Sequence, residues 1–208
     1  MSHREASERQ ARLDFLIESA SRTFAVHGVD DSSLELIARE AEYTRRTLYS
    51  YFTGRDEIVL SVLLRDLKTR IAVHEEAVRT VRGGLNKLIK WADSYLQYAL
   101  ENPDSFRLQS YVNYNGINRD RIDADLVENF YRFNEQLRGQ LRSIFEDGIR
   151  ERCFLPGLNI DICVSQFVHS MRAILSVTIS EGGSTACVDP QFYFFSFLSV
   201  FIRGIQRI

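Results

Sequence analysis

The chain has 208 residues, of which 45% are hydrophobic and 26% charged. These are ordinary globular values, and they exclude a disordered or fibrous protein. The formal net charge is −2, so bulk charge cannot hold nucleic acid and any such site must be local. The N-terminal residues 1–12 are polar, no stretch reaches about 18 apolar residues, and the cysteines lack CxxC spacing. We therefore expect a cytoplasmic protein with no membrane partner, disulfide framework or metal.

Apolar residues recur every three or four positions along most of the chain, which predicts an all-α fold. Three helices fit within about the first fifty residues. The first has an apolar stripe from Leu13 to Phe24 and ends at Gly28. The second begins at Ser32, where Ser32 and Glu35 have the spacing of a capping box. The third follows Thr44 and covers residues 45–52.

Six more helices are predicted beyond residue 55, with glycine or proline between most of them. The longest periodic run extends from Ile122 to Gly148 and ends before Pro156-Gly157. In the last helix, Asp189 precedes a proline at the first helical position. The predicted ranges are 56–82, 85–101, 104–115, 122–148, 160–180 and 190–206.

Residues 32–52 have the short helix, tight break and second helix that are typical of a helix-turn-helix. Leu48 and Phe52 share the inner face of the second helix, whereas arginine, threonine, tyrosine and serine side chains cover its outer face. Residues 43–55 contain three arginines and no acid, a local charge of +3. Arginine reads guanine edges and hydroxyl groups bind phosphate. This surface therefore predicts binding to double-stranded DNA.

Residues 28–38 and 41–57 resemble the DNA-binding head of TetR-family transcriptional regulators. The resemblance covers about residues 10–60, because the Ile37-Ala38 pair, the Thr47-Leu48-Tyr49-x-x-Phe52 core and the run Arg55-Asp56-Glu57 occur in register. It implies a helix-turn-helix domain at 1–55 and a ligand-binding and dimerisation domain at 56–208. It also implies a homodimer that binds a palindromic operator, usually represses transcription and is released by a small molecule.

The resemblance also assigns DNA-contacting residues. The two serines of this set lie where the first helix of the motif touches phosphate, and Arg55 lies where a basic residue often holds phosphate. Tyr51 is equally well explained by packing, and Glu35 is expected to cap its helix. Glu42 occupies a position where the family usually has glycine, so the turn needs a positive φ or a different geometry. The assigned residues are Ser32, Ser33, Thr44, Arg45, Arg46, Thr47, Tyr49, Tyr51 and Arg55.

Aromatic residues predict the effector site. Trp91, Tyr95 and Tyr98 are spaced i, i+4 and i+7, a stripe that fits either a packed core or the wall of a pocket. Other candidates lie on helices that surround the pocket in the family, which implies a largely apolar effector and no cofactor. We expect His169 to be a hydrogen-bonded helix residue, since it has no histidine or cysteine four positions away. The full candidate set is Trp91, Tyr95, Tyr98, Tyr111, Tyr114, Phe130, Phe133, Phe167, His169 and Met171.

The segment from Phe192 to Ile202 is apolar nearly all round and carries no charge. A helix of this kind is buried on several sides, so we expect the last two helices of two chains to form a four-helix interface. A strand is the alternative on propensity alone.

The sequence bears on three other functions. The sequence contains no GxSxG, Walker A, GxGxxG or HExxH motif, so an enzyme is not expected. A thiol switch at Cys153, Cys163 or Cys187 is a second possibility. The third is a protein-interaction module whose head does not bind DNA.

Overall fold

The computed structural model describes residues 3–180 and 189–207, and its regular elements are helices throughout this part of the chain. This confirms the all-α prediction. Packing divides the chain into unit 1, Met1–Asp66 with Leu108–Tyr131, and unit 2, Leu67–Arg107 with Arg132–Ile208. Residues 56–66 and 108–131 thus pack with the N-terminal helices. The functional division at residue 55 stays a prediction.

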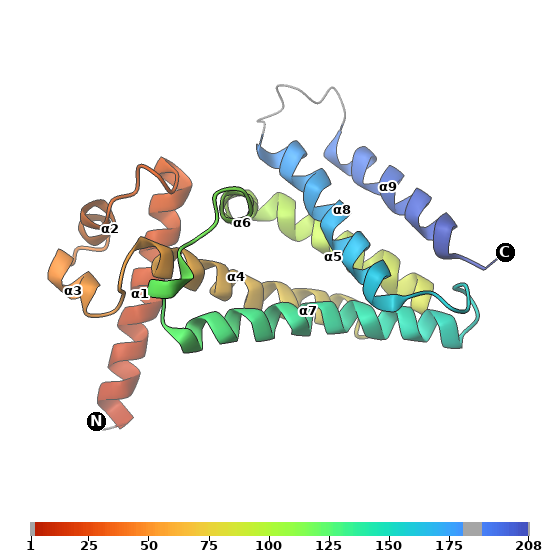
Figure 1. The fold of residues 1–208 in the computed structure, drawn as a ribbon, viewed down its shortest axis with the longest axis horizontal. Helices are drawn as coiled ribbons and strands as arrows, with labels where there is room; N and C mark the ends of the chain where they lie inside the picture. The colour runs from red at the N-terminus through yellow and green to blue at the C-terminus, as the bar shows by residue number, and fades with distance from the viewer. Residues whose placement is uncertain (1–2, 181–188, 208) are drawn as a thin grey trace. The chain divides into compact units, whose positions relative to one another are not determined.

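Unit 1 contains three N-terminal helices, α1 (His3–His27), α2 (Leu34–Glu40) and α3 (Arg45–Tyr49), drawn in red to orange in Figure 1. It also holds the first part of α4 (Arg55–Val78). The end of α6 (Pro103–Asn115), the short 3₁₀ helix η1 (Arg119–Arg121) and the start of α7 (Ala124–Arg150) complete it. Buried apolar side chains from these elements form one cluster, the head core, which includes Leu16, Phe24, Ile37, Leu48, Phe52, Ile58, Leu63 and Leu108.

Local signals fix the ends of the first helices. Gly28, at φ 75°, ends α1 in the left-handed region, where glycine has no steric penalty. Ser33, and not Ser32, caps α2, because the Ser33 hydroxyl oxygen accepts a hydrogen bond from the Leu36 amide at 3.1 Å. Thr44 caps α3 in the same way, accepting from the Thr47 amide at 3.1 Å.

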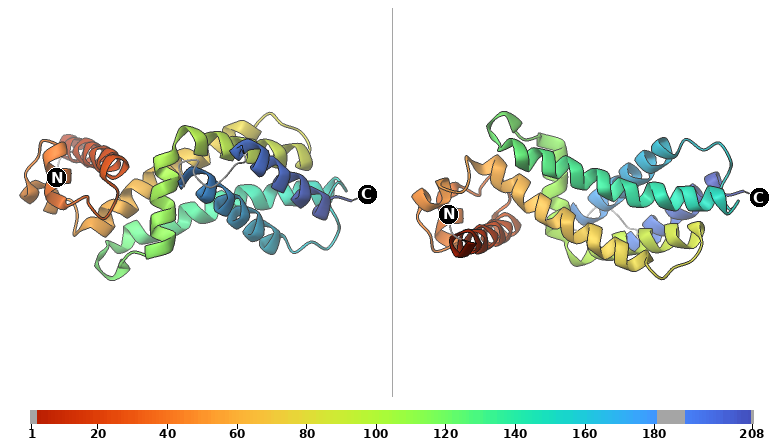
Figure 2. Two further views of the ribbon diagram at one scale, coloured as in Figure 1. Left: turned by 90° about the horizontal axis from the view of Figure 1, so that it is seen from above. Right: turned by 90° about the horizontal axis from the view of Figure 1, so that it is seen from below.

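Unit 2 contains the rest of α4, α6 and α7 with α5 (Gly84–Glu101), α8 (Ile160–Ser180) and α9 (Pro190–Ile205). Helices α8 and α9 lie side by side, and α5 packs against both (Figures 1 and 2). The Asp189 carboxylate accepts from the Gln191 amide at 2.9 Å and Pro190 opens α9, as predicted. The strand alternative for residues 192–202 is therefore wrong.

Three helix bounds in the structure differ from the predicted ones. Helix α3 ends at Tyr49, before Phe52. Helix α4 ends at Val78, four residues before Arg82, because the chain passes into turns with i to i+3 backbone hydrogen bonds. Helix α7 begins after Ile122, because Asp123 caps it by accepting from the Leu126 amide at 3.0 Å.

The N-terminus of α5 lies directly against the C-terminal part of α7. A Cβ atom added at Gly84 would stand 2.3 Å from the Gly148 nitrogen and 2.5 Å from its Cα. The Glu151 carboxylate accepts from the Gly84 amide at 2.7 Å. Lys87 Nζ lies 2.6 Å from Asp147 Oδ2. Only glycine permits this approach of two backbones, and two charged contacts accompany it.

Replacing Gly84 with alanine is expected to lower the free energy of unfolding by about 3 kcal/mol, because the new methyl group meets rigid backbone. Gly139→Ala is the matched control. Gly139 lies within α7 with nothing within 4 Å of an added Cβ, so that change should stabilise the protein by about 0.5–1 kcal/mol. Urea unfolding at one fixed protein concentration measures both variants. Equal effects of the two changes would contradict the close approach.

Candidate functional site

The outer face of α3 presents polar side chains, while Leu48 on its inner face is buried in the head core. Arg46 is exposed and, within the described residues, makes no hydrogen bond or ion pair. Thr44 and Thr47 hydroxyl oxygens lie 2.9 Å apart at the start of the helix, and Tyr49 is 47% exposed near its end. A guanidinium group, two hydroxyls and a phenol thus share one accessible surface, which we call the α3 surface.

Arg45 is engaged within the protein. Its guanidinium group forms an ion pair with Glu35 of α2 and donates to the Tyr49 hydroxyl at 3.2 Å. The hydrogen bond with Tyr49, followed by the charge of Glu35, raises the pKa of Arg45. Glu35 was expected to cap α2; instead it pairs with Arg45, since Ser33 supplies the cap. Arg46 is therefore the arginine of α3 that is free to meet a ligand.

The turn between α2 and α3 keeps a glutamate in a glycine-like conformation. Glu42 has φ 58° and is exposed. Of the two geometries expected for this position, the positive φ is the one adopted. Tyr43 beside it is partly buried against the head core. This packing holds Glu42 in a backbone conformation that usually favours glycine.

Of the predicted DNA-contacting residues, Ser32 is buried and Tyr51 is partly buried. Ser32 is fully buried, and its hydroxyl lies within hydrogen-bonding distance of the Gly28 and Thr23 carbonyls. Its side chain therefore cannot reach a phosphate, and this assignment is corrected. Tyr51 is partly buried against the head core, with the Arg9 guanidinium 5.3 Å from its ring centroid, which favours the packing role. Ser33 remains exposed.

Arg55 supports the turn before α2. Its guanidinium group donates to the carbonyls of Val29 and Asp30, each at 3.2 Å. The Asp30 carboxylate also accepts from the Tyr111 hydroxyl at 2.6 Å, a hydrogen bond that raises the pKa of Tyr111. Arg55 is thus a structural link within unit 1, and its contact with phosphate stays a prediction.

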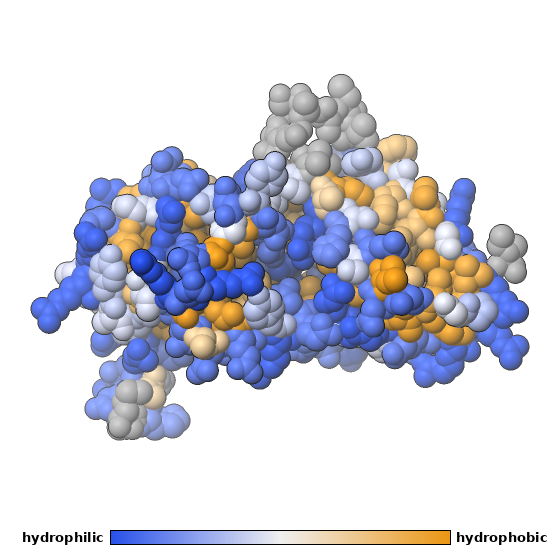
Figure 3. All heavy atoms as spheres, in the orientation of Figure 1, coloured by the Kyte–Doolittle hydropathy of each residue, from blue (hydrophilic) through white to orange (hydrophobic). Residues whose placement is uncertain are grey.

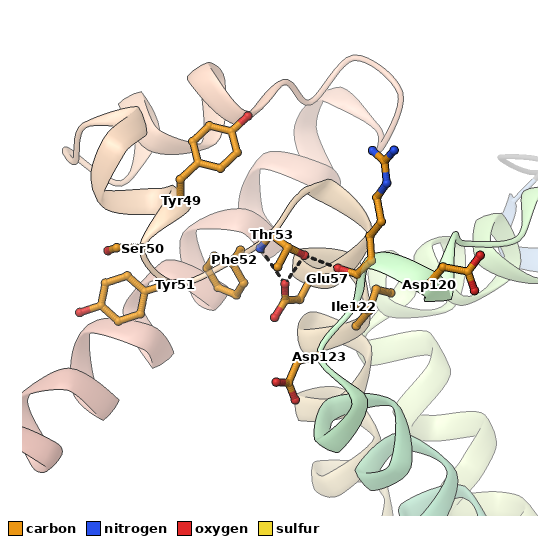
Figure 4. Close-up of a pocket in the computed structure, with 10 residues that line it drawn as sticks. Tyr49, Ser50, Tyr51, Phe52, Thr53, Glu57, Asp120, Ile122 and Asp123 are labelled. Atoms are coloured by element: carbon orange, nitrogen blue, oxygen red, sulfur yellow. Dashed lines mark hydrogen bonds between the residues drawn. The ribbon is translucent and has the colours of Figure 1, made fainter.

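Sequence reasoning did not find a cleft that adjoins α3. It has a volume of about 450 Å³ and lies between residues 49–53 and residues 120–123, with Glu57 also in its wall. Figure 4 shows Thr53 beside the Glu57 carboxylate. The Thr53 hydroxyl oxygen is 2.5 Å from Glu57 Oε2 and 2.5 Å from the Arg121 carbonyl oxygen. Asn118 donates its backbone N–H to Asp56 at 2.9 Å. The contacts of Arg121 and Asn118 join segments more than sixty residues apart, so no local pattern predicts them.

Part of the predicted effector site gathers in the interior of unit 2. Trp91 stacks on Tyr95 with ring centroids 5.5 Å apart, and Phe167 lies 6.3 Å from Trp91. The Trp91 indole N–H donates to the Gln140 side chain at 3.1 Å. Trp91, Tyr95 and Phe167 are buried, as are Tyr98 and Met171. They pack against one another as core side chains do.

The remaining effector candidates lie elsewhere. Tyr111 and Phe130 pack on the head core of unit 1, because α6 and α7 each contribute to that unit. Tyr114 is 95% exposed. Phe133 is half-buried beneath the Lys68 and Arg132 side chains at 5.0 and 5.1 Å. His169 is exposed, with Nδ1 3.5 Å from the Ser165 hydroxyl. None of these placements is that of an internal pocket wall.

The cysteines give little support to a thiol switch. Burial raises the pKa of the Cys163 thiol, which disfavours the reactive thiolate. Cys153 is half-buried and its thiol lies 3.3 Å from the Gly148 carbonyl, and Cys187 lies outside the described residues. Over residues 3–180 and 189–207, no three potential metal ligands gather, and no helix is both long and apolar enough to cross a bilayer.

The sequence of the head matches a known family model. Residues 16–62 match the family described as bacterial regulatory proteins, tetR family. The chain is 35% identical over 63 residues to the HTH-type transcriptional regulator SrpR of Pseudomonas putida, a match that spans 30% of each protein. It is 26% identical over 154 residues to the HTH-type transcriptional repressor SCO4008 of Streptomyces coelicolor, covering 72% of this chain and 73% of that protein.

Solved structures share the fold over nearly the whole chain. FadR of Bacillus subtilis in complex with stearoyl-CoA has a TM-score of 0.73 at 17% identity, over 93% of this chain and all of its own (100%). The ketosteroid transcriptional regulator KstR2 of Mycobacterium tuberculosis has a TM-score of 0.65 at 19% identity, over 95% of this chain and 96% of its own. The head of this chain is thus similar in sequence to that of the tetR family of bacterial regulatory proteins, and the chain as a whole shares the fold of these solved regulators.

Proposed function

We propose that this protein is a cytoplasmic transcriptional regulator, without enzymatic activity, that binds a palindromic operator as a homodimer. The observation that carries the proposal is the α3 surface, where Arg46 is exposed and has no partner among the described residues, on a segment that bears three arginines and no acid. An arginine in this position can contact a guanine edge bidentately in the major groove. The repressor SCO4008 supports negative control of transcription.

The proposed homodimer uses the exposed face of α8 and α9. Figure 3 shows apolar side chains gathered over these two helices. The exposed members are Ile162, Phe192, Tyr193, Phe195 and Val200, and we call this set the α8–α9 face. Phe192 and Val200 are 70% and 69% exposed, and contiguous apolar surface of this kind marks an interaction site. Two copies brought together on this face form the four-helix interface expected from the sequence.

A small, largely apolar effector would control the dimer. The solved relative FadR holds stearoyl-CoA, and unit 2 of this chain encloses the aromatic group around Trp91. An effector releases DNA when it binds more tightly to a state in which the two α3 helices no longer match the groove spacing of about 34–36 Å. We assign the coupling to α4, which contributes residues to both units.

Fluorescence anisotropy tests the proposal. The purified protein is titrated into labelled duplex from the upstream region of its own gene, and into a scrambled duplex, at 50 and 200 mM salt. We expect saturable, sequence-dependent binding that weakens by tenfold or more at the higher salt, because phosphate contacts release counterions. No binding to any duplex at 50 mM salt would refute DNA binding and favour the interaction module.

Glu35 is expected to hold back the DNA affinity of the α3 surface. Glu35→Gln removes the carboxylate that pairs with Arg45, so Arg45 becomes available to phosphate and binding should tighten about two- to fivefold at low salt. Glu40→Gln is the matched control, since Glu40 is an exposed acid of the same helix that faces Arg39. The same anisotropy titration measures both variants. An equal gain in the two would mean that only net charge changed.

A further inference from the structure

One histidine of unit 2 is enclosed by aromatic rings. His74 lies on α4 and is 0% exposed. Its ring centroid is 4.7 Å from that of Trp91, 5.6 Å from Tyr95 and 6.2 Å from Tyr98. A polar heterocycle in such surroundings needs partners for both ring nitrogens.

The hydrogen bonds around Ser94 fix the proton on this histidine. The Ser94 hydroxyl donates its only proton to the Trp91 carbonyl at 2.8 Å. Its oxygen therefore accepts from His74, and the 2.9 Å contact is an Nδ1–H donor to Ser94 Oγ. Burial, and then the charge of Arg70, lower the pKa of His74 to about 3. The ring is thus neutral at physiological pH, with a lone pair on Nε2.

Two polar atoms of this aromatic group have no partner. His74 Nε2 and the Tyr95 hydroxyl oxygen are both buried, and neither makes a hydrogen bond within the described residues. The Tyr95 ring is 1% exposed, held between Trp91 and an edge contact with Phe106 at 5.5 Å. One acceptor from α4 and one phenol from α5 are therefore unpartnered on rings whose centroids lie 5.6 Å apart, and buried polar groups are rarely left unsatisfied.

The chemistry of these two atoms restricts what can bind them. A bare Nε2 accepts only from a donor, which excludes carboxylates, ketones and ethers as its partner. An ammonium group is disfavoured, because the positive charge of Arg70 already acts on His74. A hydroxyl group fits, because it donates to Nε2 and accepts from the Tyr95 O–H. The surrounding rings favour an apolar, aromatic body for the rest of the molecule.

We propose that unit 2 recognises a neutral, hydroxyl-bearing apolar molecule of the phenol or alcohol class through His74 Nε2 and the Tyr95 hydroxyl. This rests on the proposed effector function and gives the effector a chemical class. The hydroxyl of the ligand donates to His74 and accepts from Tyr95, while its apolar body replaces ring contacts among Trp91, Tyr95 and Tyr98.

Tryptophan fluorescence reads the site directly, because Trp91 is the single tryptophan of the chain. The full-length protein, without DNA, is titrated with 4-propylphenol and with 4-propylanisole, excited at wavelengths above the phenol absorption. The two probes share their apolar body, and only the phenol has an O–H. We expect saturable quenching by 4-propylphenol and at least tenfold weaker binding of 4-propylanisole.

Two variants locate the contact. Tyr95→Phe removes the unpartnered hydroxyl alone, and His74→Asn keeps an amide near Ser94 while removing Nε2. Each should weaken binding of 4-propylphenol at least tenfold, whereas Tyr114→Phe, at the 95% exposed tyrosine, should leave it unchanged. Equal binding of the two probes, or full affinity in Tyr95→Phe, would overturn the proposal, as would failure of 4-propylphenol to bind at 1 mM. If His74 Nε2 and the Tyr95 hydroxyl bind only water, the titration gives one of these contradicting results.

The titration is independent of DNA, so the two proposals can fail separately. If the operator titration fails and 4-propylphenol binds as expected, the binding site stands and its regulatory role is wrong. If operator binding holds and the probes do not discriminate, the regulator stands and the hydroxyl-recognising site is wrong.

Discussion

Replacing Arg46 with alanine is expected to weaken operator binding by about 1–3 kcal/mol for each half-site. The two copies in a dimer make this about 2–6 kcal/mol in total, the largest effect expected from one substitution in the head. Arg46 has no partner within the part of the chain that the structure describes, whereas Arg45 is paired with Glu35. The loss should be greatest on the operator and smaller on scrambled duplex, because a base contact exists only at the correct sequence.

Two controls separate base reading from charge. Arg79→Ala removes the same charge from unit 2 and should leave operator affinity within about twofold. Arg46→Lys keeps the charge but loses the planar donor pair, so sequence preference should relax while the salt dependence is retained. If Arg46→Ala weakens binding to operator and scrambled duplex equally, Arg46 contacts phosphate and the base-reading assignment fails.

Val200→Asp is expected to convert the proposed dimer into monomers. Two copies of the change place two carboxylates in an interface that is otherwise apolar, which costs at least about 3 kcal/mol, or more than a hundredfold in the dimer dissociation constant. Operator binding should fall with it, because two half-sites are held together only by the dimer. Analytical ultracentrifugation measures the mass, and anisotropy measures the binding.

The control for this change is a valine of similar exposure in unit 1. Val26 is 76% exposed on α1, so Val26→Asp introduces the same carboxylate away from the α8–α9 face and should leave the dimer intact. Circular dichroism shows whether each variant is folded. A folded Val200→Asp that remains dimeric at micromolar concentration would place the interface elsewhere.

The local sequence pattern predicts the helices of this chain but not their exact ends. The Asp189-Pro190 signal predicts the start of α9 because cap and proline act within one turn. Ser32 and Ser33 offer the same hydroxyl at adjacent positions, so local chemistry does not distinguish them. Burial against α1 decides, turning Ser32 inward and leaving Ser33 to cap α2.

In the candidate sites too, local sequence predicts some features, and contacts between distant residues determine the others. Exposure of Arg46 follows from helical periodicity, which places it opposite Leu48. The pairing of Arg45 with Glu35 depends on how α2 and α3 are packed, which periodicity does not give. Likewise the aromatic stripe predicts a core or pocket position for Tyr95. The resemblance places Tyr111 on a helix around the effector pocket, but it does not predict that Tyr111 bonds to Asp30 in unit 1. Neighbours distant in sequence determine what a buried face touches.

The two glutamates beside α3 bear on how such a regulator would be distributed over a chromosome. A genome offers about 10⁶–10⁹ competing sites, all with the same phosphates. Glu35 occupies Arg45 and Glu42 is an exposed carboxylate in the preceding turn, so both reduce attraction to every duplex alike. The proposed contact of Arg46 with a base would be gained at the operator alone. Fewer copies would then be sequestered along unrelated DNA, and a smaller number of molecules would suffice to keep one operator filled.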